Sequence, residues 1–337
     1  MSKLKELARF FGLSALTTVV IAAAFLGFRS QVKQKIQQAT YQQLTESAQQ
    51  QADGLRRYIA IVTGQLEALA KFSEDPARRT NLEAFYAELY GGAGMSWVAY
   101  AGLDGAITSG PCKGCSVAGE DWFLRCTGGE SVAGIARLGG ESEPESIVLA
   151  VPVKTNGTVD AVLIAAMDQK GVAEFIRSDA FNNGTFALLS DSDGDVFAVA
   201  NQATVMTLEM NLFDFATDQS LRGTTIAELK AAFKNGETVV SSIKRGGKIY
   251  YSVDFPVGVE DWYVVLSVPR SVADTLSGQV LPYVVVMLIL VILVNAAVIV
   301  QAYRHEKQAV AALEREKDLL RQSSERYMLI NRLSNEV

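Results

Sequence analysis

The stretch IVLAVPVKTNGTVDAVLIAAMD, residues 147–168, consists of two apolar runs on either side of the polar residues around Asn156-Gly157. Valine and isoleucine are enriched in strands, and Asn-Gly is typical of a two-residue hairpin turn. The stretch therefore predicts two antiparallel strands, over residues 146–155 and 159–168, joined by a tight turn.

Hairpin patterns also occur on both sides of this stretch. Residues 97–110 (WVAYAGLDGAITSG) place Asp104-Gly105 at a turn, and residues 186–200 (FALLSDSDGDVFAVA) place Asp193-Gly194 at another. Further strands are expected at residues 131–137, 238–244, 248–256 and 262–269. This repeat predicts two modules of α+β class, residues 93–170 (the first module) and 171–277 (the second module). Each is expected to contain a five-stranded antiparallel sheet with helices beside it.

A long amphipathic helix is expected before the strands. From residue 29 to 74 the chain is rich in glutamine and alanine, with apolar residues at spacings of three and four. This stripe consists of Val32, Ile36, Ala39, Leu55, Tyr58, Ile59, Val62, Leu66 and Leu69. About 46 helical residues make a rod of roughly 70 Å, which Asp75-Pro76 ends and a short helix at residues 81–90 follows, within a stalk of residues 29–92. The stripe also predicts a parallel homodimer that packs through it.

Two uncharged apolar segments enclose this region, at residues 10–28 and 280–300. Each can cross a hydrocarbon core of roughly 30 Å as a helix, the second within a span of residues 278–300. Basic residues flank both segments: Lys3, Lys5, Arg9, Arg304 and Lys307. Residues 1–9 and 301–337 are therefore expected in the cytoplasm, and the region between them outside it. A cleavable signal peptide is the alternative for the first segment, because residues 22–24 are alanines.

The region expected outside the cytoplasm, residues 29–300, has an excess of acidic residues. The chain has 31 basic and 37 acidic residues; the first 28 residues hold three and one of them, and residues 301–337 hold seven and six. That leaves 21 basic and 30 acidic residues, a net charge of −9, in residues 29–300. An acidic exterior argues against a nucleic-acid partner.

Enzymatic chemistry is not expected for this chain. Its single histidine, His305, lies beyond the second apolar segment, so the exterior lacks the imidazole of a nucleophilic triad or a His-bearing zinc site. No phosphate-binding loop pattern is present. Asp191, Asp193 and Asp195 suggest an EF-hand, but the loop has Val196 and Gln202 where glycine and glutamate are needed. We therefore expect no catalytic residues, no metal and no cofactor, and assign the acidic residues to turn chemistry.

The segment after the second span predicts a short signalling coiled coil. Val310, Leu313, Leu320 and Tyr327 lie near heptad a and d positions, while Lys317 and Ser324 weaken the seam. Residues 324–337 (SERYMLINRLSNEV) resemble the opening helix of a cytoplasmic PAS domain such as precedes GGDEF cyclase domains. We expect either a longer gene product or a separate signalling partner.

Several local motifs carry a resemblance to a known family. They are Glu120-Asp121-Trp122-Phe123, IVLAVPV at residues 147–153 followed by VDAVLIAAMD at 159–168, Asn211-Leu212-Phe213-Asp214, and DWYVVLSVP at residues 261–269. Their order resembles the double Cache (dCache) ectodomain, with its long helix and two PAS-like modules, of bacterial chemoreceptors, histidine kinases and diguanylate cyclases. The resemblance covers roughly residues 30–275.

The resemblance implies a ligand pocket in the membrane-distal module, here the first module, between the sheet and the helix that carries a tryptophan. Trp122 and Phe123 match the aromatic pair of that pocket, with core packing as the alternative role. The amino-acid-sensing subgroup has an arginine two residues before the tryptophan and an aspartate on the last strand. This chain has Glu120 and Ala166 there, which favours a small molecule other than an α-amino acid.

Five further residues are candidates for ligand contact. Asp121 belongs to the same motif as Trp122, and Trp97 and Tyr100 line the pocket only if they lie on its inner face. Asp168 shares a strand face with Ala166, with capping of the next helix as the alternative role. Arg137, like Arg125, can bind an anionic ligand, with a solvated or salt-bridged charge as the alternative.

The cysteines lie in the first module: Cys112, Cys115 and Cys126. The CxxC pair is followed by Ser116, so it is no haem-attachment motif. In an oxidising compartment we expect one disulfide, either Cys112 to Cys115 or one of these to Cys126. The remaining thiol leaves a redox-sensing role as the alternative.

Together these patterns predict the ligand-sensing input region of a receptor in the bacterial inner membrane, which is a homodimer and signals to a cyclase or kinase output. The alternatives are a structural two-span envelope protein resembling the polysaccharide co-polymerases, or a fragment of a chemoreceptor. The repeated hairpins favour a receptor, because the co-polymerases are dominated by long helices.

Overall fold

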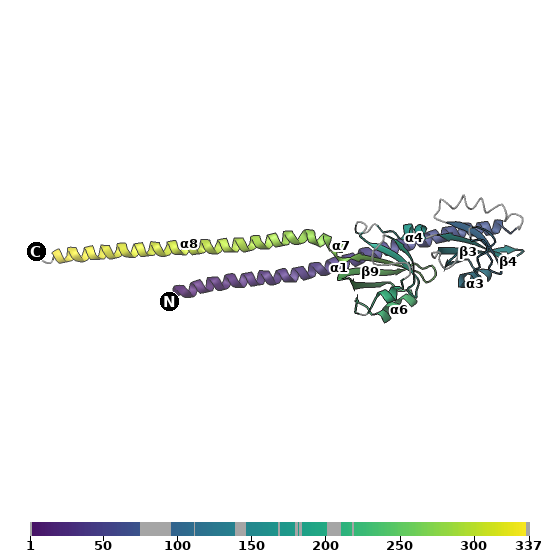
Figure 1. Cartoon of the computed structure of the whole chain (residues 1–337). Helices are drawn as coiled ribbons and strands as arrows, with labels where there is room; N and C mark the ends of the chain where they lie inside the picture. The colour runs from purple at the N-terminus through teal and green to yellow at the C-terminus, as the bar shows by residue number, and fades with distance from the viewer. Residues whose placement is uncertain are drawn as a thin grey trace. The chain divides into compact units, whose positions relative to one another are not determined.

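The computed structural model describes residues 2–74, 96–110, 112–138, 146–167, 169–178, 181, 184–200, 210–217 and 219–334 (Figure 1). The chain divides into two compact units. One comprises residues 36–274 and contains both modules; the other comprises residues 1–35 together with 275–337.

The long N-terminal helix is confirmed. Helix α1, Ser2–Phe72, is 71 residues long, so it extends further toward the N-terminus than the predicted rod. At its end the carbonyl of Leu69 accepts hydrogen bonds from both the amide and the hydroxyl of Ser73, at 3.0 and 2.8 Å. The short helix expected at residues 81–90 lies outside the described residues.

The sheet of the first module is antiparallel, in the order β1-β4-β3-β2. Its strands are β1 Trp97–Gly102, β2 Val132–Ala136, β3 Ser146–Thr155 and β4 Thr158–Met167. Asn156 and Gly157 both have positive φ, 53° and 84°, as a hairpin turn of this type requires. The predicted hairpin at the centre of the module is therefore confirmed.

The predicted count of five strands is wrong for the described part of this sheet, which has four. The chain after the Asp104-Gly105 turn does not continue as a full strand; Ile107 makes only an isolated bridge to Ala101. The amide of Ile107 donates to the carbonyl of Cys115, and the amide of Gly114 donates to the carbonyl of Ile107. The segment thus shares its hydrogen bonds between the cysteine loop and β1, where the amide of Thr108 donates to the carbonyl of Tyr100.

The sheet of the second module has six described strands, in the order β6-β5-β10-β9-β8-β7. They are β5 Phe186–Ser190, β6 Val196–Ala200, β7 Leu221–Arg222, β8 Val239–Arg245, β9 Lys248–Pro256 and β10 Tyr263–Pro269. The prediction of five missed β7, a two-residue edge strand paired with β8 through Leu221 and Ile243. So short a strand has no period that sequence patterns detect.

Short helices accompany the sheets: α3 Asp121–Thr127 in the first module, α4 Gln169–Ile176 after β4, and α5 Leu212–Phe215, α6 Ile226–Lys234 and α7 Arg270–Ala273 in the second. Helix α6 begins with a capping box formed by Thr225 and Glu228. Asn211 caps α5 by accepting a hydrogen bond from the amide of Phe213.

The apolar stripe of α1 packs inside its own chain. From Leu44 to Ala70 it shares one hydrophobic core with one face of each sheet (Figure 1). Leu55 and Leu66 are fully buried there. The prediction that a homodimer packs through Leu55 is therefore wrong, because the sheets already cover this face. The opposite sheet faces form two separate cores, one under α3 and one under α5 and α6.

Helix α8, Thr275–Ser334, is continuous through the predicted second span and most of the tail. Among the described residues, one helical stretch is long and apolar enough to cross a membrane, Leu288–Arg326, and its apolar window is not buried in the protein. The first span, residues 10–28, lies within α1 and stays a prediction, as do the coiled coil and the homodimer. Leu313 and Leu320 are exposed on α8.

Candidate functional site

Helix α3 sets its two aromatic side chains against the sheet of the first module. The carbonyl of Glu120, just before the helix, accepts hydrogen bonds from the amides of Phe123 and Leu124 and so starts the first turn. Trp122 is 4% exposed and Phe123 1%, with their rings edge to face at 6.1 Å between centroids. The two rings lie between α3 and the sheet.

A glycine on β2 makes room for the indole. A Cβ atom on Gly134 would lie 2.6 Å from Cγ and Cδ1 of Trp122, closer than such atoms approach. The Nε1 donor of Trp122 is buried and has no hydrogen-bond partner among the described residues. Such a donor costs roughly 1–3 kcal/mol, and a ligand acceptor would remove that cost.

The other candidates divide between the two faces of the sheet. Trp97 and Ala166 belong to the same core as Trp122. Tyr100 faces the opposite way, into the core shared with α1, where its hydroxyl lies 2.8 Å from Oγ of Ser73. Successive strand residues point to opposite faces, so Tyr100 cannot share the wall of Trp97. The prediction that Tyr100 lines the ligand pocket is wrong.

The charged candidates lie at the surface or outside the residues that the structure describes. Asp121, in the first turn of α3, and Arg137, directly after β2, are exposed, whereas Glu120 is half-buried. Asp168 lies outside the described residues. The structure therefore brings together Trp122, Phe123 and Trp97 but not the charged candidates.

The structure pairs Cys112 with Cys115, with 5.6 Å between their Cα atoms. Cys126, on the buried face of α3, is free and fully buried. Burial, and secondly the negative charge of Glu130, raises the pKa of the Cys126 thiol to about 12. A thiol that stays protonated is a poor nucleophile, which argues against Cys126 as a redox sensor.

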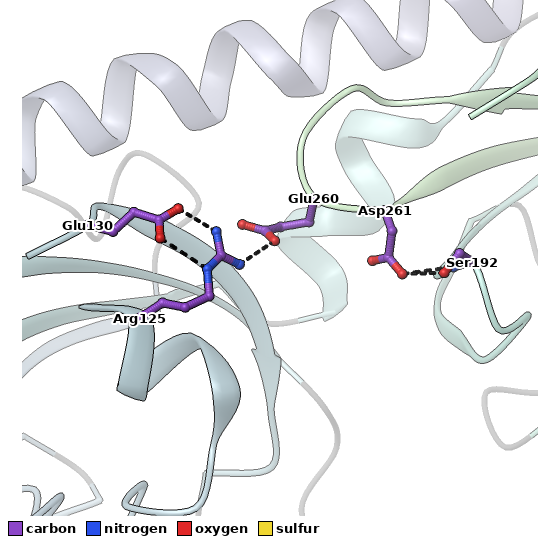
Figure 2. A network of polar contacts seen from close by, with 5 residues as sticks. All are labelled: Arg125, Glu130, Ser192, Glu260 and Asp261. Atoms are coloured by element: carbon purple, nitrogen blue, oxygen red, sulfur yellow. Dashed lines mark hydrogen bonds and ion pairs between the residues drawn. The ribbon is translucent and has the colours of Figure 1, made fainter. Parts of the chain in front are cut away.

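Helix α3 also makes a polar contact with the second module (Figure 2). Arg125 donates from Nε and Nη2 to the carboxylate of Glu130, at 3.2 and 2.6 Å, and from Nη1 to Glu260, at 2.7 Å. These hydrogen bonds raise the pKa of Arg125 and lower that of Glu130. Sequence patterns gave no sign of the pairing with Glu260, which lies 135 residues away.

Glu260 belongs to the turn between β9 and β10, which contacts three other elements. The guanidinium of Arg56 on α1 donates from Nε to the carbonyl of Val257, at 2.8 Å. Asp261 accepts hydrogen bonds from the hydroxyl and the amide of Ser192, in the turn between β5 and β6 (Figure 2). One short turn of the second module is thus connected to α1, to α3 and to its neighbouring hairpin.

The acidic turn of the second module is built as turn chemistry predicts. The Asp191 carboxylate accepts hydrogen bonds from the amides of Asp193 and Asp195, at 3.1 and 2.8 Å. Burial raises the pKa of Asp191 to about 6. Among the described residues, no group of three or more histidine, cysteine or acidic side chains is arranged to hold a metal ion.

The second module contains a feature that the sequence did not indicate. Its sheet face under α5 and α6 encloses a cavity of about 20 Å³, whose wall includes Asp254 and three serines. Asp254 is 3% exposed. Burial raises its pKa to about 7, although a hydrogen bond from Ser252 opposes the shift.

The chain belongs to the Cache domain family, because the dCache_1 model of that family matches residues 28–276. This confirms the resemblance found in the sequence motifs. No curated protein sequence matches the chain.

Solved structures show the same fold. The extracellular domain of rpHK1S-Z16, described as a histidine kinase, is 13% identical with a TM-score of 0.53, over 74% of this chain and 98% of that one. The ligand-binding domain of the Pseudomonas fluorescens chemoreceptor CtaA, in complex with L-alanine, is 14% identical with a TM-score of 0.52, over 68% and 97%. At these identities the likeness concerns the fold alone.

Proposed function

We propose that residues 29–277 are the extracytoplasmic ligand-sensing input region of a bacterial transmembrane receptor. Spans at residues 10–28 and 278–300 anchor it in the inner membrane, and residues 301–337 pass the signal to a cytoplasmic output such as a diguanylate cyclase or kinase. The observation that carries this proposal is the single core in which α1 packs against both sheets.

The shared core supplies a route for the signal. Because protein interiors are close-packed, a sheet that changes shape displaces the side chains against it. Leu55, Ile59 and Leu66 of α1 are in that position, and α1 is continuous from Ser2 to Phe72. A small shift or rotation of a packed helix is an established form of switching.

The contact of Arg125 with Glu260 supplies a second route. A ligand that displaces α3 also displaces the Arg125 guanidinium, which holds the turn between β9 and β10. The same turn accepts a hydrogen bond from Arg56 of α1 at Val257. Movement of α3 would therefore be transmitted through this turn to the second module and to α1.

We place the ligand of the first module under α3, at the unpartnered Nε1 of Trp122. A small polar molecule with a hydrogen-bond acceptor fits this donor. The half-buried Glu120 repels a ligand carboxylate, and Ala166 offers nothing to an ammonium group. Ordinary α-amino acids are therefore expected to bind poorly, in contrast to the L-alanine bound by CtaA.

Membership of the Cache family favours a receptor over a structural envelope protein. It does not choose the output, because the fold occurs both in a chemoreceptor and in a protein described as a histidine kinase. A homodimer, if formed, uses a surface of α1 other than the buried stripe, and Ile61 is exposed there.

A ligand screen on the full chain in lipid nanodiscs tests the proposal. One small polar metabolite should raise the thermal midpoint, since a ligand at a hundredfold excess over Kd adds about 2.7 kcal/mol. Trp122→Phe, which keeps the aromatic bulk but removes the Nε1 donor, should reduce the shift. Trp262→Phe, the same substitution at a buried tryptophan of the second module, leaves that donor intact and is the matched control. A shift that is equal in all three proteins would place the ligand elsewhere.

Labelling in cells tests the topology. A thiol introduced by Ser142→Cys in the first module should react with a membrane-impermeant reagent in intact cells with a permeabilised outer membrane. A thiol introduced by Ser324→Cys should react only after lysis. Labelling of both only after lysis would contradict an extracytoplasmic sensor.

A further inference from the structure

The cavity of the second module lies beside three strands that each contribute a serine. Ser241 on β8 is paired in register with Ser252 on β9, which is paired with Ser267 on β10. The Ser267 hydroxyl lies 2.9 Å from that of Ser252, which donates to Oδ1 of Asp254 at 3.2 Å. The hydroxyl row thus leads to a buried carboxyl group at the cavity wall.

Among the described residues Asp254 has no ion-pair partner, and its carboxylate accepts a hydrogen bond from the Ser252 hydroxyl. A buried carboxylate is costly unless a positive charge or several donors accompany it. A cation bound beside Asp254 would offset the cost of ionising it. No lysine or arginine among the described residues supplies that cation.

Aromatic rings form another part of the wall. Phe186 and Tyr250 lie edge to face at 5.7 Å between centroids, and Phe215 completes this side. Aromatic rings attract cations. The guanidinium of Arg245, 3.6 Å from the Phe215 ring centroid, already uses that ring, so Phe186 and Tyr250 are the rings left for a ligand.

The size of the cavity limits the ligand. About 20 Å³ holds one group the size of a water molecule. An ammonium group has that size and offers hydrogen-bond donors to the carboxylate and to the serine oxygens. The net charge of −9 on residues 29–300 also concentrates cations around this region.

We propose that this cavity is a second binding site, separate from that under α3, for the ammonium group of a small protonated amine such as methylammonium. This ammonium group binds the carboxylate of Asp254 and the hydroxyl oxygens of Ser252 and Ser267. The proposal is independent of a ligand under α3, so either can fail without the other.

Charged groups on the neighbouring elements do not occupy this position. The charged side chains of α5 and α6, Asp214, Glu228, Lys230 and Lys234, are exposed, while Leu229 and Phe233 face the sheet. Tyr250 on β9 lines the cavity, and Tyr263 on β10 interacts electrostatically with Asp254, with Glu237 just before β8 and with Asp261. The pKa of Tyr263 is raised to about 12, so it stays neutral near pH 7.

Equilibrium dialysis of radiolabelled methylammonium against the full chain in nanodiscs tests the site at pH 8 and fixed ionic strength. We expect saturable binding of one equivalent per chain. Asp254→Asn should weaken it at least tenfold. Asp214→Asn, which removes an exposed carboxylate of the same module, should bind as the wild type does.

Two further measurements make the result decisive. Binding should be about tenfold weaker at pH 6 than at pH 8, because a carboxyl group with a pKa of about 7 is mostly protonated at the lower pH while an alkylamine, with a pKa of about 10.4, is charged at both. Ser252→Ala should also weaken binding, which tests the site if Asp254→Asn does not fold. Absence of saturable binding to the folded wild type, or equal binding to Asp254→Asn, would overturn the proposal. Equally strong displacement by potassium chloride would overturn the assignment to an amine.

Discussion

The two modules share a sheet architecture but differ in what lies on the sheet face away from α1. In the first module that face is apolar, with Val148, Val162 and Ile164 packed under the rings of α3. In the second module the corresponding hairpin, β9 and β10, carries Ser252, Asp254 and Ser267 beside a cavity. The fold decides which positions point inward, and the side chains at those positions decide whether that face is apolar or polar.

The largest expected effect comes from the buried acid of the second module. Burial raises its folded pKa to about 7, above the usual aspartate value of about 3.9, so the folded state binds more protons and stability falls as pH rises from about 4 to 7. Over that range the free energy of unfolding should drop by on the order of 4 kcal/mol relative to Asp254→Asn.

Urea unfolding of the full chain at several pH values measures this difference, and the exposed Asp214→Asn is the control, expected to show a flat difference from wild type. If the free energies of unfolding of the wild type and of Asp254→Asn changed in parallel from pH 4 to 7, Asp254 would be solvated. The second module would then lack the buried acid that distinguishes it from the first.

An intermediate effect is expected from filling the first module further. In Gly134→Ala the added Cβ would lie 2.6 Å from the Trp122 ring, and overpacking of this kind costs roughly 1–3 kcal/mol. Gly119→Ala, where nothing lies within 4 Å of the added atom, is the matched control. Denaturant unfolding followed by tryptophan fluorescence measures the stability of both variants. Equal stabilities would mean that the added methyl group fits beside the Trp122 ring.

The smallest effect is expected where the modules meet. Arg125 and Glu260 are partly exposed, so their pair should contribute roughly 0.2–1 kcal/mol. A double-mutant cycle of Arg125→Gln and Glu260→Gln measures the coupling, which should shrink at high salt. The exposed Arg321–Glu325 pair of α8 is the control and should show less coupling. Zero coupling at low salt would remove this route between α3 and the second module.

Local patterns predicted the parts of the fold that depend on near neighbours. The hairpin at residues 146–168 was predicted closely because Asn156 and Gly157 favour the positive φ that its turn needs. The opposite orientation of Trp97 and Tyr100 was also available from their odd separation along β1. The stripe on α1 was visible, but a stripe does not reveal what covers it, and here the sheets do.

The features that escaped prediction depend on long-range register. Ser241, Ser252 and Ser267 become one row only when β8, β9 and β10 pair as they do. Arg125 and Glu260 meet only when α3 and the turn between β9 and β10 are both in place. The residue pattern within one segment does not predict its contacts with a segment far away in the sequence.

The shared core of α1 has a consequence for how the protein is made. Its stripe ends at Ala70, whereas β10, the last strand that covers it, ends at Pro269. At about 5–20 residues per second, synthesis of the intervening roughly 200 residues takes on the order of 10–40 s. Until then part of the apolar face of α1 has no native cover, so the nascent chain needs protection from aggregation until its last strand has emerged.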